Sequence, residues 1–351
     1  MTTITARKRL ITLAALASAI ALTATGCASG SGDAPTDGPA DPVDVSINTY
    51  GIAAEFPLYL AQEKGYFTDE GVDVTFVNTA KSASDAIPLM ATGQLDFYLG
   101  QPSAAEFSAA NQGIGIKFVA APVTYVPGQT APGLVVSKQL VDSGEYTTLA
   151  DLKGRKIGVL GSGSSSQYFV QLALAKAGLT LDDVEFVNLA FADMVPALAS
   201  GSIAAAWESE PFYTLAVSQG DAVPAVGIGD VAAGFPFTLD VSPQFAQDHP
   251  DAVTGVVAAV LKGAQFYQQA MTNGGAEKEE VIDALVEYTA QKDRAAYDNQ
   301  VMPAANPDGV VQIDQLEDFQ DFLISAGSLK APADIPAMYD DQYLKAALGT
   351  K

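Results

Sequence analysis

Cysteine, histidine, tryptophan and basic side chains are scarce in this chain. Its 351 residues include one cysteine, one histidine and one tryptophan, and 18 lysines and arginines stand against 41 aspartates and glutamates. A single cysteine cannot form an internal disulfide. One cysteine and one histidine also leave too few ligands for a zinc site, so we expect no metal centre. With a net charge of −23, the chain has no excess of positive charge to neutralise phosphates, which excludes a nucleic-acid-binding protein.

Catalytic side-chain sets are missing as well. The only histidine, His249, precedes Pro250 near a predicted helix start, and no second base of that kind is available for a Ser-His-Asp set. The Gly-x-Ser-x-Gly elbow of serine hydrolases does not occur. A glycine-rich run at residues 161–166 lacks both the lysine of a P-loop and the third glycine of a dinucleotide fingerprint. We therefore expect a protein that is not an enzyme and that has no cofactor.

The first 26 residues have the pattern of an export signal. Arg7, Lys8 and Arg9 precede an uncharged, mostly apolar run over residues 10–25, which is too short for a comfortable membrane span. The run ends in ATGC at residues 24–27, which resembles a bacterial lipobox except that Ala24 stands where leucine is usual. We expect residues 1–26 to be a lipoprotein signal peptide and Cys27 to carry a lipid. A plain signal peptide with an incidental cysteine is the alternative.

Residues 27–42 are rich in Gly, Ser, Asp, Pro and Ala, which predicts a flexible tether. Removal of residues 1–26 takes away three positive charges and changes the net charge from −23 to −26. We interpret this acidic excess as solvated surface that favours solubility. Residues 43–351 remain for one large domain or two modest lobes.

Strands and helices alternate along the first two thirds of the chain. Residues 45–49 alternate as a strand does, and Pro57 then opens a helix that stops at Gly65. The same order repeats, with further strands expected over 72–77, 95–99, 117–121, 156–160, 184–189 and 203–207. Later apolar periodicities predict a helical C-terminal tail, near 253–271, 277–289 and 313–326. This order is typical of an α/β fold with mainly parallel sheets covered on both faces.

The α/β pattern starts a second time near residue 136. We expect lobe 1 to comprise residues 43–135 and 240–351, and lobe 2 residues 136–239. Extended segments near 134–137 and 236–241 would cross between them as a hinge. Because ligands of open α/β sheets collect outside the carboxyl ends of the strands, the cleft between two such lobes is the expected site. Closure about a hinge is an established way to enclose a solute.

Four segments carry a family pattern. They are PLYLAQEKGYF at 57–67 with EGVDV at 70–74, ATGQLDF at 91–97, LKGRKIGV at 152–159 and ALASGSIAAAWESEP at 197–211. Together they resemble the substrate-binding proteins of ABC transporters for nitrate, sulfonates, taurine and thiamine-pyrimidine precursors. One departure is Ala205, where the family usually has aspartate. The resemblance implies a two-lobed periplasmic-binding-protein type II fold.

The resemblance also implies a function for the protein and a location in the cell. It would be a monomer anchored by Cys27 outside the cytoplasmic membrane, would bind a small molecule, and would have an ABC permease and its ATPase as partners. Its ligand-binding loops carry over to residues 50–56, 100–103, 161–166, 191–193 and 207–210. The candidate ligand-binding residues are Tyr50, Glu55, Phe56, Gln101, Ser103, Ser162, Ser164, Ser165, Asp193, Trp207, Glu208 and Glu210.

Each candidate also has a structural interpretation. Residues 161–166 could cradle an anion or a polar ring edge at a helix terminus, or could form a flexible turn with an N-cap. Trp207 could stack on a flat ligand, with the carboxylates of Glu208 and Glu210 accepting its N–H groups, or could pack in the core. Glu55 suits any helix N-terminus, and Asp193 could cap its helix.

The scarcity of arginine bears on the ligand. Only Arg155 and Arg294 follow the signal, neither lies on a candidate loop, and Lys81 is the only basic residue nearby. An anion binder is expected to offer a guanidinium or ammonium group. Our hypothesis is therefore a neutral or cationic nitrogen-containing ligand, pyrimidine-like or otherwise heteroaromatic. The alternatives are a sulfonate, taurine or nitrate binder, a ligand-sensing subunit of a membrane receptor, and, from another class, a lipid-anchored hydrolase that uses cleft carboxylates.

Overall fold

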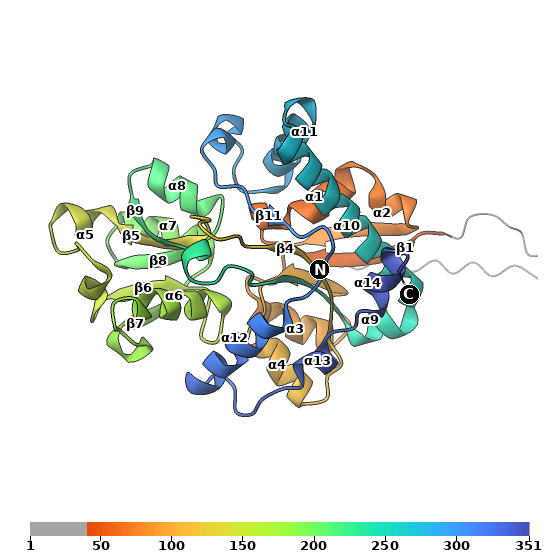
Figure 1. Cartoon of the computed structure of the whole chain (residues 1–351), viewed down its shortest axis with the longest axis horizontal. Helices are drawn as coiled ribbons and strands as arrows, with labels where there is room; N and C mark the ends of the chain where they lie inside the picture. Colours follow the sequence, from red (N-terminus) through yellow and green to blue (C-terminus); the bar gives the residue numbers. More distant parts are fainter. Residues whose placement is uncertain (1–40, 351) are drawn as a thin grey trace, which may run out of the picture. The chain divides into compact units, whose positions relative to one another are not determined.

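A computed structural model describes residues 41–350, which contain two β-sheets with helices on their faces (Figure 1). The first sheet has the order β11-β4-β10-β3-β1-β2, with β1 at Val43–Asn48, β2 at Val72–Val77, β3 at Phe97–Gly100, β4 at Lys117–Thr124, β10 at Phe237–Val241 and β11 at Ala304–Ala305. The second has the order β7-β6-β8-β5-β9, with β5 at Gly133–Ser137, β6 at Lys156–Val159, β7 at Glu185–Asn188, β8 at Ala205–Glu208 and β9 at Ala222–Gly227. The expected signal peptide and Cys27 lie outside the described residues.

Both sheets are mixed, whereas mainly parallel sheets were expected. In the first sheet β1 pairs in parallel with β2 and β3, but β10 runs antiparallel to β3 and β4. In the second, β6 pairs in parallel with β7 and β8, but β5 is antiparallel to β8 and β9. Strands β5 and β10 enter a sheet directly from the other one, so they run against the strands built from strand–helix–strand units, and the short β11 is also antiparallel to β4.

The two sheets are joined by two crossings, through residues 125–132 between β4 and β5 and through residues 228–236 between β9 and β10. The extended segments expected to form the hinge are therefore the strands β5 and β10 themselves, and the chain crosses in the residues before each of them. The exact division of the chain into lobes at residues 135 and 240 stays a prediction.

Helices follow most strands of both sheets. In the part that leads from β1 to β10 they are α1 (Phe56–Glu63), α2 (Tyr66–Asp69), α3 (Ala83–Ala91), α4 (Ala104–Asn111), α5 (Lys138–Asp142), α6 (Ser165–Ala175), α7 (Phe191–Ala199) and α8 (Phe212–Ser218). The C-terminal part adds α9 (Pro243–Asp248), α10 (Pro250–Asn273), α11 (Gly275–Tyr288), α12 (Ile313–Ser325), α13 (Ile335–Met338) and α14 (Gln342–Ala347). The helical C-terminal tail is confirmed, with the short strand β11 as an unexpected addition.

The C-terminal helices pack against both sheets' helices. In α10, Gly263 lies so close to α1 that a Cβ there would meet the carbonyl oxygen of Pro57 at 2.3 Å. In α12, the Phe319 ring lies 5.9 Å from Phe107 of α4 and 5.3 Å from Tyr168 of α6, measured between centroids. Because α4 follows a strand of the first sheet and α6 one of the second, α12 ties the two halves together through aromatic contacts.

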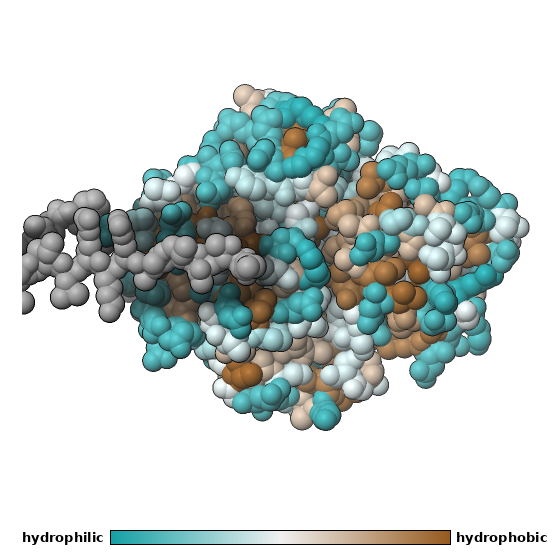
Figure 2. Space-filling view, turned by 180° about the vertical axis from the view of Figure 1, so that it is seen from behind, coloured by the Kyte–Doolittle hydropathy of each residue, from teal (hydrophilic) through white to brown (hydrophobic). Residues whose placement is uncertain are grey.

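Acidic residues lie mainly at the surface, as the composition suggested. Among the described residues only Glu55, Glu106, Glu208, Glu210 and Asp240 are buried acids. Figure 2 shows one face on which hydrophilic residues are widespread and hydrophobic residues gather in smaller areas. Within residues 41–350, no helix combines the length and the apolar character that a membrane crossing requires.

Candidate functional site

A cavity of about 340 Å³ lies between the two sheets, where the carboxyl ends of their parallel strands meet. Its wall comes from the residues that end or follow β1, β2 and β3 on one side and β6, β7 and β8 on the other, with three residues from the crossings and β10. These residues are Tyr50, Ile52, Ser82, Ala83, Ser84, Tyr98, Gln101, Ser103, Tyr125, Pro132, Leu160, Gly161, Ser162, Ser164, Ser165, Asn188, Phe191, Trp207, Ser209 and Phe237. The location agrees with the rule for ligands of open α/β sheets.

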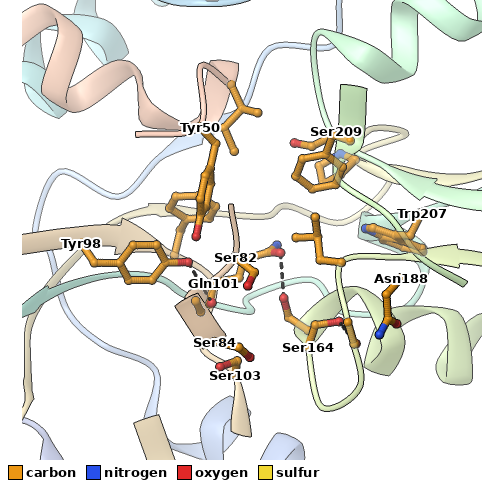
Figure 3. Close-up of a pocket in the computed structure, with 18 of the residues that line it drawn as sticks. Tyr50, Ser82, Ser84, Tyr98, Gln101, Ser103, Ser164, Asn188, Trp207 and Ser209 are labelled. Carbon is orange, nitrogen blue, oxygen red and sulfur yellow. Dashed lines mark hydrogen bonds between the residues drawn. The ribbon is translucent and has the colours of Figure 1, made fainter. Parts of the chain in front are cut away.

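The cavity brings together the candidates from four of the five expected loops. The residues concerned are Tyr50, Gln101, Ser103, Ser162, Ser164, Ser165 and Trp207. Figure 3 shows Tyr50 and Tyr98 on one side, Trp207 and Asn188 on the other, and Gln101 between them. The remaining loop, residues 191–193, contributes Phe191 instead of Asp193, which is exposed in the first turn of α7.

Phe56 and Glu55 lie behind the wall rather than in it. The Phe56 ring is fully buried and stacks on Tyr267 of α10 with 3.7 Å between centroids. The Glu55 carboxylate accepts hydrogen bonds from Tyr50 N at 2.7 Å, Ile52 N at 3.1 Å and Tyr59 Oη at 2.6 Å. Glu55 thus fixes the loop that presents Tyr50. Its burial raises the pKa of the carboxyl to about 7.

Glu208 and Glu210 do not line the cavity either. Glu210 accepts hydrogen bonds from Thr214 Oγ1 at 2.8 Å, Gln300 Nε2 at 3.3 Å and Val301 N at 3.2 Å, and its main-chain oxygen accepts one from Ala53 N at 3.0 Å. It therefore ties β8 to the first-sheet side. Both carboxyl oxygens of Glu208 are buried without a partner among the described residues, and burial raises its pKa well above the usual range.

Trp207 combines the two interpretations that its sequence left open. The indole is 1 % exposed and packs on Phe169 of α6 with 5.1 Å between centroids, yet it also contributes to the cavity wall. Together with Tyr50, Tyr98, Tyr125, Phe191 and Phe237, it gives the cavity six aromatic side chains. Such a wall suits a flat ligand.

Serine side chains supply much of the polar lining. Ser82, Ser103 and Ser164 are the N-caps of α3, α4 and α6, so the amino ends of three helices meet the cavity. Ser103 Oγ accepts a hydrogen bond from Ala105 N at 3.1 Å, and Ser164 Oγ accepts one from Gln167 N at 3.2 Å. Gly163 takes a left-handed conformation, with φ of 73°. The run at residues 161–166 is therefore both a capped turn and part of the wall.

Charged side chains are absent from the wall that the described residues form: none of its members is Asp, Glu, Lys, Arg or His. Lys81, the basic residue considered from the sequence, is exposed and not part of it. Residues 41–350 also hold no group of three or more side chains of the kinds that bind metals. The chemistry of the cavity is thus that of aromatic rings, hydroxyls and two carboxamides, Gln101 and Asn188.

Several wall residues were missed from the sequence. Ser82 and Ser84 follow β2 and Asn188 is the last residue of β7, so the strand-end rule would have found them had it been applied to every parallel strand. Tyr125 lies in the first crossing and Phe237 is the first residue of β10, and no sequence pattern marks either residue as cavity-facing.

A family model described as NMT1/THI5 like matches residues 53–270, which is more than half of the chain. A Brucella abortus protein that carries the name of a binding protein is 26% identical over 307 residues, covering 82% of this chain and 86% of that protein. A 4-amino-5-hydroxymethyl-2-methylpyrimidine phosphate synthase of Aspergillus parasiticus is 28% identical over a shorter stretch, 42% of this chain and 40% of that enzyme.

Solved structures agree in fold. The nitrate-binding protein NrtA of Synechocystis superposes with a TM-score of 0.72 at 16% identity, covering 88% of this chain and 89% of that one. The alkanesulfonate-binding protein SsuA of Xanthomonas axonopodis does so with a TM-score of 0.68 at 18% identity, covering 86% and 99%. The expected type II periplasmic-binding-protein fold is confirmed.

Proposed function

Because the chain belongs to the NMT1/THI5-like family, we propose that it is the extracytoplasmic solute-binding protein of an ABC importer, and that its ligand is a small, uncharged, nitrogen-containing heteroaromatic compound such as a pyrimidine. The observation that carries this proposal is the cavity between the two sheets, with its aromatic and uncharged polar wall. It has the size and the few convergent polar groups of a small-molecule site. The lipid on Cys27 is part of the proposal, as are the permease and ATPase partners.

The wall narrows the ligand hypothesis that the sequence allowed. A cationic ligand would need a carboxylate, and the expected ones, Glu55, Glu208 and Glu210, lie outside the wall. Burying an unpaired ionic group is strongly unfavourable. An uncharged ring is instead matched by Tyr50, Tyr98 and Trp207 for stacking, and by hydroxyls and carboxamides for its N–H and carbonyl or ring-nitrogen groups.

One observation favours the anionic alternative of sulfonate, taurine or nitrate. The N-cap serines of α3, α4 and α6 line the cavity, and the amino ends of helices carry partial positive charge. Each of these helices has at least eight residues. Such a site could hold an anion without a basic side chain.

The hydrolase alternative finds no support in the cavity. It required two acidic groups facing each other across the cleft, and no carboxylate is part of the wall of the described residues. We therefore propose binding without turnover. Transport and sensing are separated by deleting the gene, since only a transport protein is required for uptake of the solute.

The test is a melting-temperature screen of the full chain against pyrimidines, thiamine precursors, flavins, purines, sulfonates, taurine and nitrate. A ligand at a hundredfold excess over its dissociation constant stabilises the folded state by about 2.7 kcal/mol. We expect a shift with an uncharged heterocycle, lost in Trp207→Ala. A shift with sulfonates or nitrate only would contradict the heteroaromatic ligand and leave the importer role in place.

A further inference from the structure

Gln101 occupies a distinct position in the cavity. It follows β3, and its side chain lies between the two halves of the wall (Figure 3). Its Nε2 donates a hydrogen bond to Tyr125 Oη at 2.7 Å, and its Oε1 accepts one from Ser165 Oγ at 2.9 Å. These partners come from the first crossing and from the amino end of α6. The carboxamide is therefore held from two sides.

The backbone around Gln101 is held in the same way. Ala104 N donates a hydrogen bond to Gly163 O at 2.9 Å, and Ser103 pairs with Ser164 as an isolated antiparallel bridge. A Cβ on Gly163 would lie 2.8 Å from the Cβ of Ala104, so the two loops approach as closely as glycine permits. The position of Gln101 relative to the second sheet is thus fixed by contacts on both sides of it.

A carboxamide with one bond at each end keeps one N–H and one oxygen lone pair free. Hydroxyl groups can turn to donate or accept, so the serines and tyrosines of the wall do not by themselves select a hydrogen-bond pattern. Gln101 differs because a carboxamide offers a donor and an acceptor side by side whichever way round it is held. Of the two carboxamides in the wall, Gln101 is the one held by side-chain hydrogen bonds, one to the first crossing and one to the amino end of α6.

We propose that Gln101 is a specificity-determining residue that selects ligands with an adjacent donor and acceptor, the edge found in lactams, cyclic imides and aminopyrimidines. This inference rests on the proposed solute-binding function and names the ligand edge that the cavity recognises. The carboxamide forms a paired hydrogen bond with such an edge. An anion at the same position would lie beside the carbonyl oxygen of Gln101 as well as its N–H. The negative end of that carbonyl dipole repels the anion, which disfavours binding of sulfonates.

The probes are uracil, which carries the N–H and C=O edge, and methanesulfonate, which carries only acceptors. Wild type, Gln101→Met and Gln101→Glu are titrated with both, with Trp207 fluorescence and calorimetry as readouts. Gln112→Met is the matched control, because Gln112 is exposed and its Nε2 bonds only Ser108 O at 3.0 Å. We expect uracil to bind the wild type and the control with equal affinity. It should bind the two Gln101 variants at least tenfold more weakly. Methanesulfonate should not bind any of them.

Ligand-free melting temperatures and far-ultraviolet circular dichroism show whether the variants stay folded. Should Gln101→Met melt far below the wild type, Gln101→Asn, which keeps the carboxamide on a shorter side chain, replaces it, with intermediate affinity as the expected result. Uracil affinity that is unchanged in Gln101→Met and Gln101→Glu would overturn the inference while the binding function stands. Methanesulfonate binding to the wild type without uracil binding would overturn it together with the heteroaromatic ligand. A wild type that binds neither uracil nor methanesulfonate would also overturn the inference about Gln101. The importer role is then judged separately, by loss of solute uptake when the gene is deleted.

Discussion

Glu208 is a residue whose position in the sequence suggested a ligand contact that the structure does not show. At the end of β8, next to Trp207, it was expected to bind ligand, but it is buried outside the wall with both carboxyl oxygens unpartnered among the described residues. Burial and the neighbouring negative charge of Glu210 raise its pKa well above the usual range. The folded state therefore favours the protonated acid, whereas the unfolded state releases the proton at the ordinary glutamate pKa.

Replacing Glu208 by glutamine should stabilise the protein in mildly alkaline solution. The folded-state pKa is raised, so wild-type stability falls as the pH rises above the ordinary glutamate pKa, and Glu208→Gln removes that titration. We expect the variant to be more stable than the wild type by about 1–3 kcal/mol at pH 8 and by little at pH 5, measured by urea unfolding. Glu317→Gln, at an exposed position, is the control. An equal stability difference at both pH values would contradict the buried, protonated acid.

Glu55 gives a second pH dependence, with a defined window. Its pKa is raised from 4.5 to about 7, so the folded state retains a proton that the unfolded state loses between these values, and stability decreases as the pH rises through the window. The contribution reaches about 3 kcal/mol across it, at 1.36 kcal/mol per pKa unit. Glu55→Gln should flatten the slope of unfolding free energy between pH 4.5 and 7. Because the substitution also disturbs hydrogen bonds, the slope is the readout, and an unchanged slope would refute the assignment.

At the scale of elements, the short turn before α6 matters most for the site. Gly163 combines a positive φ of 73° with a contact that leaves no room for a side chain beside Ala104. Gly178, at the end of α6, has nearly the same φ of 72° but nothing within 4 Å of an added Cβ. Substitutions at Gly163 and Gly178 therefore separate the energetic cost of the left-handed conformation from the cost of a steric overlap with Ala104.

Gly163→Ala should be more destabilising than Gly178→Ala. Both variants place alanine in a left-handed conformation, which costs about 1–2 kcal/mol, and only Gly163→Ala adds a steric overlap worth about 1–3 kcal/mol. The excess is measured by denaturant unfolding. Ligand binding should weaken in Gly163→Ala alone, because Ser164 and Ser165 shift with the turn. Equal losses for both variants would show that the loops can move apart without penalty.

At the scale of the whole molecule, the part of the chain that the structure describes, residues 41–350, follows the expected anchor and tether in the sequence. An importer subunit gains from attachment, since it then stays near its permease, and one lipid chain contributes about 0.8 kcal/mol per buried CH₂ group. The expected diacylglycerol on Cys27 carries two chains, enough for stable attachment.

Cys27→Ser should release the protein from the membrane without changing its fold. The chain holds no other cysteine, so no second acylation site of this kind can replace it. We expect the wild type in the membrane fraction and the variant in the soluble fraction, with equal melting temperatures, and mass spectrometry should find the lipid only on the wild type. A variant that remains in the membrane fraction would contradict the anchor.

The sequence by itself determined the family, the α/β order and the loops that meet at the cavity. Strand periodicity, helix-ending glycines such as Gly65 and strand-to-helix turns are local signals, so the positions of the strands and of residues 161–166 could be predicted. The strand-end rule predicted a cleft site, the family resemblance named the loops of Tyr50, Gln101 and Trp207, and these three residues line one cavity.

Only the tertiary structure decided which side chains face that cavity and which lie behind it. Glu55, Glu208 and Glu210 lie within three residues of wall residues in the sequence but are not part of the wall, because a side chain's direction depends on the pleat and on the packing of helices from elsewhere in the chain. Tyr125 reaches the wall from the first crossing, and Phe237 reaches it from the start of β10. The mixed direction of the strands was likewise set by those crossings, which bring β5 and β10 in against their neighbours.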